Sequence, residues 1–206
     1  MKDIRQQCVD EQDKAAQIFT WCMVVAMHQE EGIGATRLTR ACNEMRAFQA
    51  RYKSKIDSGN RRKATEAMRD VLRGICDFTV RLPQNRAPRN YREERLRMAQ
   101  DEGAEIAWLV MAATAHLTFG FGKERLARLK KEAIDGYQQY IGWVKTDGED
   151  CAEEWLKRCV EQALQEELEV NDIQSGSHPP KLYYSSGVNV EDMIRVMSAV
   201  SAKMAA

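Results

Sequence analysis

The stretch from His28 to Leu38 reads HQEEGIGATRL, and a related stretch from His116 to Leu126 reads HLTFGFGKERL. The histidine, both glycines, the arginine and the leucine recur at an offset of 88 positions. Further identities at the same offset extend without a gap over Ile18 to Glu66 of the first copy. Because two copies of one pattern fold in the same way, this repeat decides the predicted architecture.

Apolar residues recur every three or four positions on both sides of each glycine turn, which is the period of an amphipathic helix. We therefore predict an all-α fold, in which two three-helix units stand in tandem and a further helix follows at the C-terminus. Asn90 with Glu93 three residues on resembles a capping box, so a helix is expected to begin near Tyr91. The predicted segments are 1–80 for the first unit, 81–98 for an exposed Arg/Pro connector, 99–172 for the second unit, and 173–206 for a loop and the last helix.

The repeated motif has a structural interpretation. Glycine takes a positive φ at a helix end without steric cost, which suits the first glycine of each copy. The second glycine lets the next helix begin close by, and the histidine is expected to cap carbonyls at the helix end, where the dipole favours a partly positive ring. The residues assigned to this turn are His28, Gly32, Gly34, His116, Gly120 and Gly122.

Composition limits the class of protein. At 206 residues, with 44% hydrophobic and 30% charged residues, the chain has the make-up of a soluble globular protein. No apolar stretch reaches the length of a membrane span, and the start of the chain has no apolar signal core, so we expect a cytoplasmic protein without a membrane partner. The six cysteines form no Cys-x-x-Cys pair and are expected to be reduced and mostly buried.

Metal and catalytic sites are not predicted. Zinc needs three or four converging ligands, whereas each copy offers one histidine with no cysteine in register. No Ser/His/Asp or Cys/His constellation can be assembled with any specificity. We therefore expect a non-enzymatic protein without a cofactor.

Charge is unevenly distributed along a chain of zero net charge. Residues 37–97 carry 17 Lys/Arg and 7 Asp/Glu, a net charge of +10. Residues 147–172 carry 2 Lys/Arg and 10 Asp/Glu, a net charge of −8. This polarity suits nucleic-acid binding by the basic part, or charge pairing between halves or between the subunits of a homodimer.

In each copy, a Gly-hydrophobic-Gly turn joins two predicted helices. This arrangement resembles the helix-hairpin-helix DNA-binding motif, in which backbone amides at the N-terminus of the second helix bind a phosphate. The connector arginines, with Tyr91 among them, are candidates for phosphate or single-stranded RNA contacts. The other interpretation, which the sequence favours slightly, is a solvated linker and helix surface. The predicted nucleic-acid-binding residues are Arg37, Arg40, Arg61, Arg62, Lys63, Arg86, Arg89, Arg92, Lys123, Arg125 and Arg128.

The acidic second half has two interpretations. It is a solvated helix face, or it is a surface that imitates nucleic acid towards a basic protein target. The residues concerned are Glu153, Glu154, Glu161, Glu166 and Glu167.

The phrase around His116, with its Phe-Gly-Phe-Gly and Arg-Leu elements, resembles a motif in small phage and prophage proteins of Firmicutes. The first copy departs from it at Glu31 and Ile33, where the aromatics stand. The resemblance implies a phage-encoded accessory protein and no particular activity. Our expectation is a non-enzymatic protein that binds nucleic acid or a nucleoprotein through its basic region. The alternative is an inhibitor of a host or anti-phage defence enzyme, comparable to an anti-CRISPR protein, that acts through the acidic half.

Overall fold

The computed structural model describes residues 3–38, 40–41, 44, 66 and 69–165. Within these ranges the chain is mainly helical and contains no strand, as the periodicity predicts. The complete helices are α1 (Ile4–Gln29), α4 (Tyr91–Phe119), α5 (Lys123–Asp147) and α6 (Glu149–Leu164). The predicted C-terminal helix, and most of the two helices predicted after the first glycine turn, lie outside the described residues.

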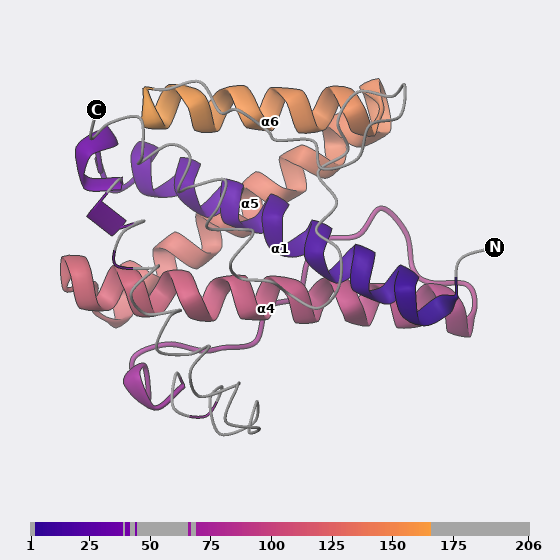
Figure 1. Ribbon diagram of the computed structural model, residues 1–206, viewed down its shortest axis with the longest axis horizontal. Helices are drawn as coiled ribbons and strands as arrows, with labels where there is room; N and C mark the ends of the chain where they lie inside the picture. Colours follow the sequence, from indigo (N-terminus) through magenta and orange to yellow (C-terminus); the bar gives the residue numbers. More distant parts are fainter. Residues whose placement is uncertain (1–2, 39, 42–43, 45–65, 67–68, 166–206) are drawn as a thin grey trace.

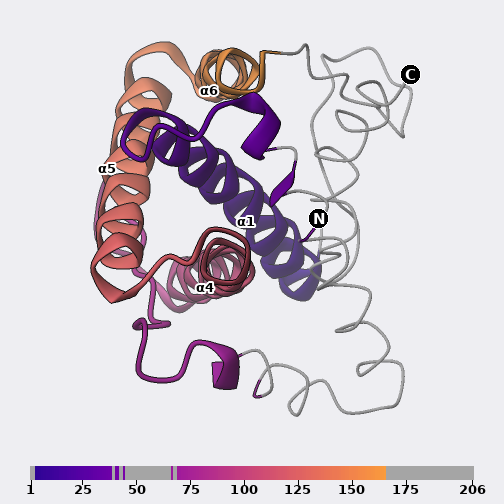
Figure 2. The same ribbon diagram turned by 90° about the vertical axis from the view of Figure 1, so that its left-hand side faces the viewer.

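Helix α1 occupies the centre of the molecule. It contacts α4, α5 and α6, while α4 and α6 lie on opposite sides of it (Figures 1 and 2). Its second half is buried around most of its circumference, because the buried residues run almost unbroken from Ala15 to Met27. A helix covered on several sides has little need of a polar face, which explains its weak amphipathic pattern.

Helices α1 and α4 run in the same direction, and matched residues meet along their first halves. Arg92 donates to Gln7 across the pair, and Gln100 donates to Glu11 with a distance of 2.6 Å. At the closest approach, a Cβ atom added to Gly103 would lie 2.1 Å from the backbone oxygen of Gln12. The absence of a side chain at Gly103 therefore allows the two backbones to come together.

The helices of the second half begin and end near the residues that the sequence indicates. Asn90 caps α4, where its side chain accepts a hydrogen bond of 2.9 Å from the amide of Glu93. The apolar residues predicted for α5 are mostly buried, among them Leu126, Leu129 and Tyr137. In α6, Trp155 is an exception, since it is 39% exposed at the edge of the core and packs edge-on against Trp143.

The segment before α4 is more closely packed than an exposed connector. Residues 77–84 run back along α4 in an extended form: the indole of Trp108 donates to the carbonyl of Asp77, and the amide of Leu82 donates to Asp101. Val80 and Leu82 are buried against the core. The prediction of a solvent-exposed connector was therefore wrong for Leu82, because the segment contributes apolar side chains and uses the buried Asp101 carboxylate as an acceptor. Residues 91–98 already belong to α4.

Among the described cysteines, Cys22 is buried, Cys8, Cys76 and Cys159 are partly buried and Cys151 is exposed; all five are free. Burial was thus predicted correctly for Cys22 and wrongly for Cys151, which lies on the outer face of α6. None of the helices within the described ranges is both long and apolar enough to cross a membrane.

Candidate functional site

The two histidines make the same contact in both copies of the motif. Nδ1 of His28 lies 3.1 Å from the carbonyl oxygen of Ile33, and Nδ1 of His116 lies 2.9 Å from that of Phe121. Since a carbonyl only accepts, the proton is on Nδ1 in each ring. The acceptor is the residue between the two glycines, so each imidazole braces the turn itself rather than the last helical carbonyls.

Backbone bonds also match between the copies. The amide of Ile33 donates to the carbonyl of Met27 and that of Phe121 donates to the carbonyl of Ala115, so in each copy the bond reaches six residues back along the chain. Gly32 and Gly120 have φ values of +62° and +67°, in the left-handed region that glycine adopts without steric cost. Ile33 and Phe121 then point into the core, where burial of each side chain stabilises the fold by about 2 kcal/mol.

The copies differ in what surrounds the turns. Glu31, beside the first turn, accepts hydrogen bonds from Arg125 (2.8 Å) and Arg128 (2.9 Å) at the start of α5. Its side chain is only 3% exposed. Burial by itself would raise the pKa of this carboxyl, but the hydrogen bonds and charges of Arg128 and Arg125 outweigh it and hold the pKa below the ordinary value. We call these three residues the Glu31 clasp.

The clasp engages two of the predicted nucleic-acid-binding residues. Arg125 also lies over the ring of Phe121, with its guanidinium carbon 3.8 Å from the centroid. The carboxylate of Glu31 therefore occupies the space between Arg125 and Arg128 that a phosphate would need. Lys123, from the same turn, is exposed and makes no ion pair among the described residues.

The position equivalent to Glu31 in the second copy is Phe119. Its aromatic side chain cannot form an ion pair with the arginines of the first copy. Arg37 and Arg40 stand 88 positions before Arg125 and Arg128, and both are exposed. Neither makes an ion pair within the described ranges. The predicted residues Arg61, Arg62 and Lys63 lie outside those ranges.

The arginines before and within the start of α4 divide into two groups. Arg86 binds Glu93 through two hydrogen bonds of 3.0 and 3.1 Å, and Arg97 pairs with Glu94. The pKa of Glu93 is held below its usual range by the backbone amide of Arg89 and by the Arg86 guanidinium. These contacts neutralise the two acidic residues of the first turn of α4.

The guanidinium groups of the second group form no salt bridge among the described residues, although the charge of Arg89 contributes to the lowered pKa of Glu93. Arg89 and Arg95 are exposed, and Arg92 donates to the neutral amide oxygen of Gln7. Tyr91 stands among them with 77% of its surface exposed, and Met98 follows two turns later on the same side of α4. We call Arg89, Tyr91, Arg92, Arg95 and Met98 the Tyr91 face.

The acidic half is largely engaged within the molecule. Lys14 of α1 binds both Glu149 and Glu153, the latter at 2.8 Å. On α6, Arg158 pairs with Glu154 and Lys157 pairs with Glu161. Glu166 and Glu167 fall outside the described residues. Four glutamates of this half, Glu149, Glu153, Glu154 and Glu161, thus form intramolecular ion pairs rather than a purely acidic surface.

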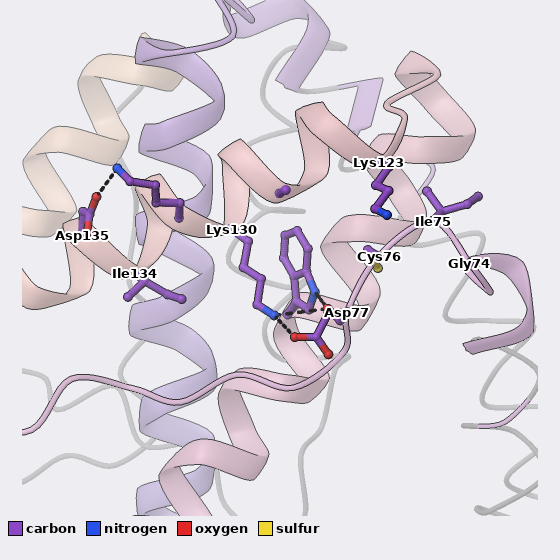
Figure 3. Close-up of a pocket in the computed structure, with 11 residues that line it drawn as sticks. Gly74, Ile75, Cys76, Asp77, Lys123, Lys130, Ile134 and Asp135 are labelled. Carbon is purple, nitrogen blue, oxygen red and sulfur yellow. Dashed lines mark hydrogen bonds and ion pairs between the residues drawn. The ribbon is translucent and has the colours of Figure 1, made fainter.

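An apolar groove of about 640 Å³ opens between residues 74–77, Trp108 and α5 (Figure 3). Lys130 crosses one side of it and donates to Asp77 Oδ2 (3.0 Å) and to the carbonyl of Thr79 (2.5 Å). The backbone amide of Thr79 and the Lys130 amine hold the pKa of the Asp77 carboxyl below its usual value. No cluster of three or more His, Cys, Asp or Glu suited to a metal occurs in the part of the chain that the structure describes.

Sequence reasoning missed the Glu31 clasp and the groove. The sequence shows Glu31 as a departure from the aromatic of the second copy, but it gives no indication that this carboxylate meets Arg125 and Arg128. The groove had no such signal, because residues 74–77 stand more than thirty positions before Trp108 and α5, which form its other walls. Comparisons of the chain with known protein families, with curated proteins and with solved structures gave no match.

Proposed function

We propose that this protein binds single-stranded nucleic acid through the Tyr91 face, as a non-enzymatic accessory protein. The observation that carries the proposal is an exposed tyrosine that stands among three arginines whose side chains form no salt bridge in the described chain. Stacking on an aromatic ring and charge pairing with phosphates are the two contacts that single-stranded nucleic acid uses most.

The charges around Tyr91 are unfavourable for the fold itself. Arg92 and Arg95 lie in the first turns of α4, where the helix dipole is positive and a cation costs roughly 0.3–1 kcal/mol. Glu93 and Glu94 would offset this, but Arg86 and Arg97 already neutralise them. A bound phosphate would relieve the remaining positive charge.

The test is fluorescence anisotropy with labelled single-stranded DNA, single-stranded RNA and duplex DNA at 50 to 200 mM salt. We expect the wild type to bind single strands more tightly than duplex. Tyr91→Ala is expected to weaken binding by about 1–3 kcal/mol per stacked base, or fivefold to more than a hundredfold. Replacing Arg89, Arg92 and Arg95 together by glutamine removes three phosphate contacts and lowers the salt slope by about 2.

A matched control removes the same charge elsewhere. Lys131, Lys145 and Arg158 are exposed on α5 and α6, so their triple replacement by glutamine keeps net charge equal to that of the arginine variant. This control should bind nearly as the wild type does. If wild type fails to bind at 50 mM salt, or both triple variants lose equal affinity, the Tyr91 face is not the binding site.

Two further parts of the proposal rest on the repeat. The matched turns support descent of the two halves from one duplicated three-helix unit, and the motif's likeness to phage proteins supports a phage or prophage setting. The alternative function, inhibition of a host or defence enzyme through the acidic half, has less support because Glu153, Glu154 and Glu161 are ion-paired within the molecule.

A further inference from the structure

We infer that the groove between residues 74–77, Trp108 and α5 binds a small aromatic or branched apolar molecule that carries a single negative charge. Its volume of about 640 Å³ lies within the usual range of small-molecule sites. The site is separate from the Tyr91 face, because Trp108 and Tyr91 are 17 residues apart on α4, which corresponds to about 25 Å along a helix.

The walls of the groove are apolar. Ile75 lies on one side and Ile134 of α5 on the other (Figure 3). Ala127 and the buried Trp108 also belong to the lining. Cys76 belongs to the same lining, and burial raises the pKa of its thiol to about 11, so the thiol stays neutral at pH 7. A ligand that displaces water from these surfaces gains about 25 cal/mol for each Å² of apolar area buried.

The charges in the groove select a monoanion. Lys130 is held by Asp77, and Lys131 binds Asp135 at 2.8 Å, so both amines are compensated. Lys123 is the remaining cation of the lining and makes no ion pair among the described residues. Its side chain extends toward the Ile75–Cys76 segment (Figure 3). One uncompensated amine beside an apolar floor fits one carboxylate, sulfonate or phosphate-type group.

Lys123 has no evident role in the fold. It is the first residue of α5, where a cation is disfavoured by the positive end of the helix dipole. An anionic group placed against Lys123 would gain from both the amine and this helix end. The Lys123 amine and the N-terminus of α5 therefore both favour an anionic group at the same end of the groove.

The probe is 1-anilinonaphthalene-8-sulfonate, an aromatic monoanion, compared with its uncharged analogue N-phenyl-1-naphthylamine. Fluorescence titration of the full chain is expected to give saturable binding of one molecule of the sulfonate. Lys123→Gln should weaken sulfonate binding about tenfold and leave the neutral analogue within about twofold, because only the charge contact is lost. Lys145→Gln, which removes an exposed charge of α5 away from the groove, is the matched control.

Ala127→Trp tests the cavity itself. Ala127 is an exposed helical residue, so a larger side chain is accommodated by the fold but fills the groove, and both probes should lose their saturable binding. Ala127→Leu serves as a smaller second variant, and thermal unfolding checks that each remains folded. Binding of both probes that is unchanged by Ala127→Trp, or equal loss of both probes in Lys123→Gln, would overturn the inference. Either result leaves the nucleic-acid proposal unaffected, since that depends on Tyr91.

Discussion

At the scale of single residues, Glu31 shows how one departure between two copies of a motif changes the role of its neighbours. The arginines of the second copy are bound by this carboxylate, whereas those of the first copy are not bound by any described carboxylate. Equal sequence thus does not give equal availability for a ligand. The repeated histidine and glycines shape both turns, and the residue that differs between the copies, Glu31 or Phe119, decides which arginines are engaged.

Glu31→Gln is expected to lower the free energy of unfolding by about 1–2 kcal/mol at pH 7, measured in urea. Hydrogen bonds to a charged group usually contribute about 1.5–3 kcal/mol to stability. The contribution is smaller here because both arginines are half exposed and solvent screens their charges. Since the folded pKa lies below the ordinary 4.5, the clasp stabilises the protein above that pH and loses its effect as the pH falls further. The difference between variant and wild type should therefore shrink on acidification.

The control for this prediction is Glu102→Gln, which removes an exposed carboxylate from the middle of α4. It should change stability by less than about 0.5 kcal/mol at any pH. A Glu31 variant that matches this control at pH 7 would show that the clasp contributes nothing to the fold.

At the scale of elements, the close crossing of α1 and α4 depends on Gly103. Gly103→Ala would place a methyl group 2.1 Å from the backbone oxygen of Gln12, and neither backbone can move without displacing a helix. We expect a loss of about 2 kcal/mol or more in the free energy of unfolding.

The matched control is the same substitution at Gly142. This residue lies within α5, is exposed, and has no atom within 4 Å of an added Cβ. Gly142→Ala should stabilise the protein by about 0.5–1 kcal/mol, because alanine loses less conformational entropy in a helix. Thermal unfolding of both variants decides the matter; two shifts of the same sign would contradict the close packing at Gly103.

At the scale of the whole molecule, the described part of the first copy does not stand apart from the second copy. Helix α1, from the first copy, is covered by α4, α5 and α6 from the second. Lys14 adds an ionic link to α6, where Glu153 and Glu149 raise the pKa of its amine against the opposing effect of desolvation. Because each half buries the other's apolar surface, the halves should fold together.

Division of the chain between Asn85 and Arg86, within an exposed bend, tests this interdependence. We expect neither fragment alone to unfold cooperatively, and an equimolar mixture to regain helical circular dichroism and a single transition. A second fragment that unfolds cooperatively by itself would show instead that the second copy is an independent unit.

The sequence by itself determined the helical class, the glycine turns and the start of α4, because helix period, positive φ and capping depend on residues a few positions apart. It also predicted the burial of Leu126, Leu129 and Tyr137 on one face of α5. Tertiary structure alone decided that Leu82 is buried, that Glu31 binds Arg125 and Arg128, and that Ile75, Trp108 and Lys123 meet in a groove. Those contacts join segments far apart in the chain, and local spacing carries no information on which of many possible pairs come together.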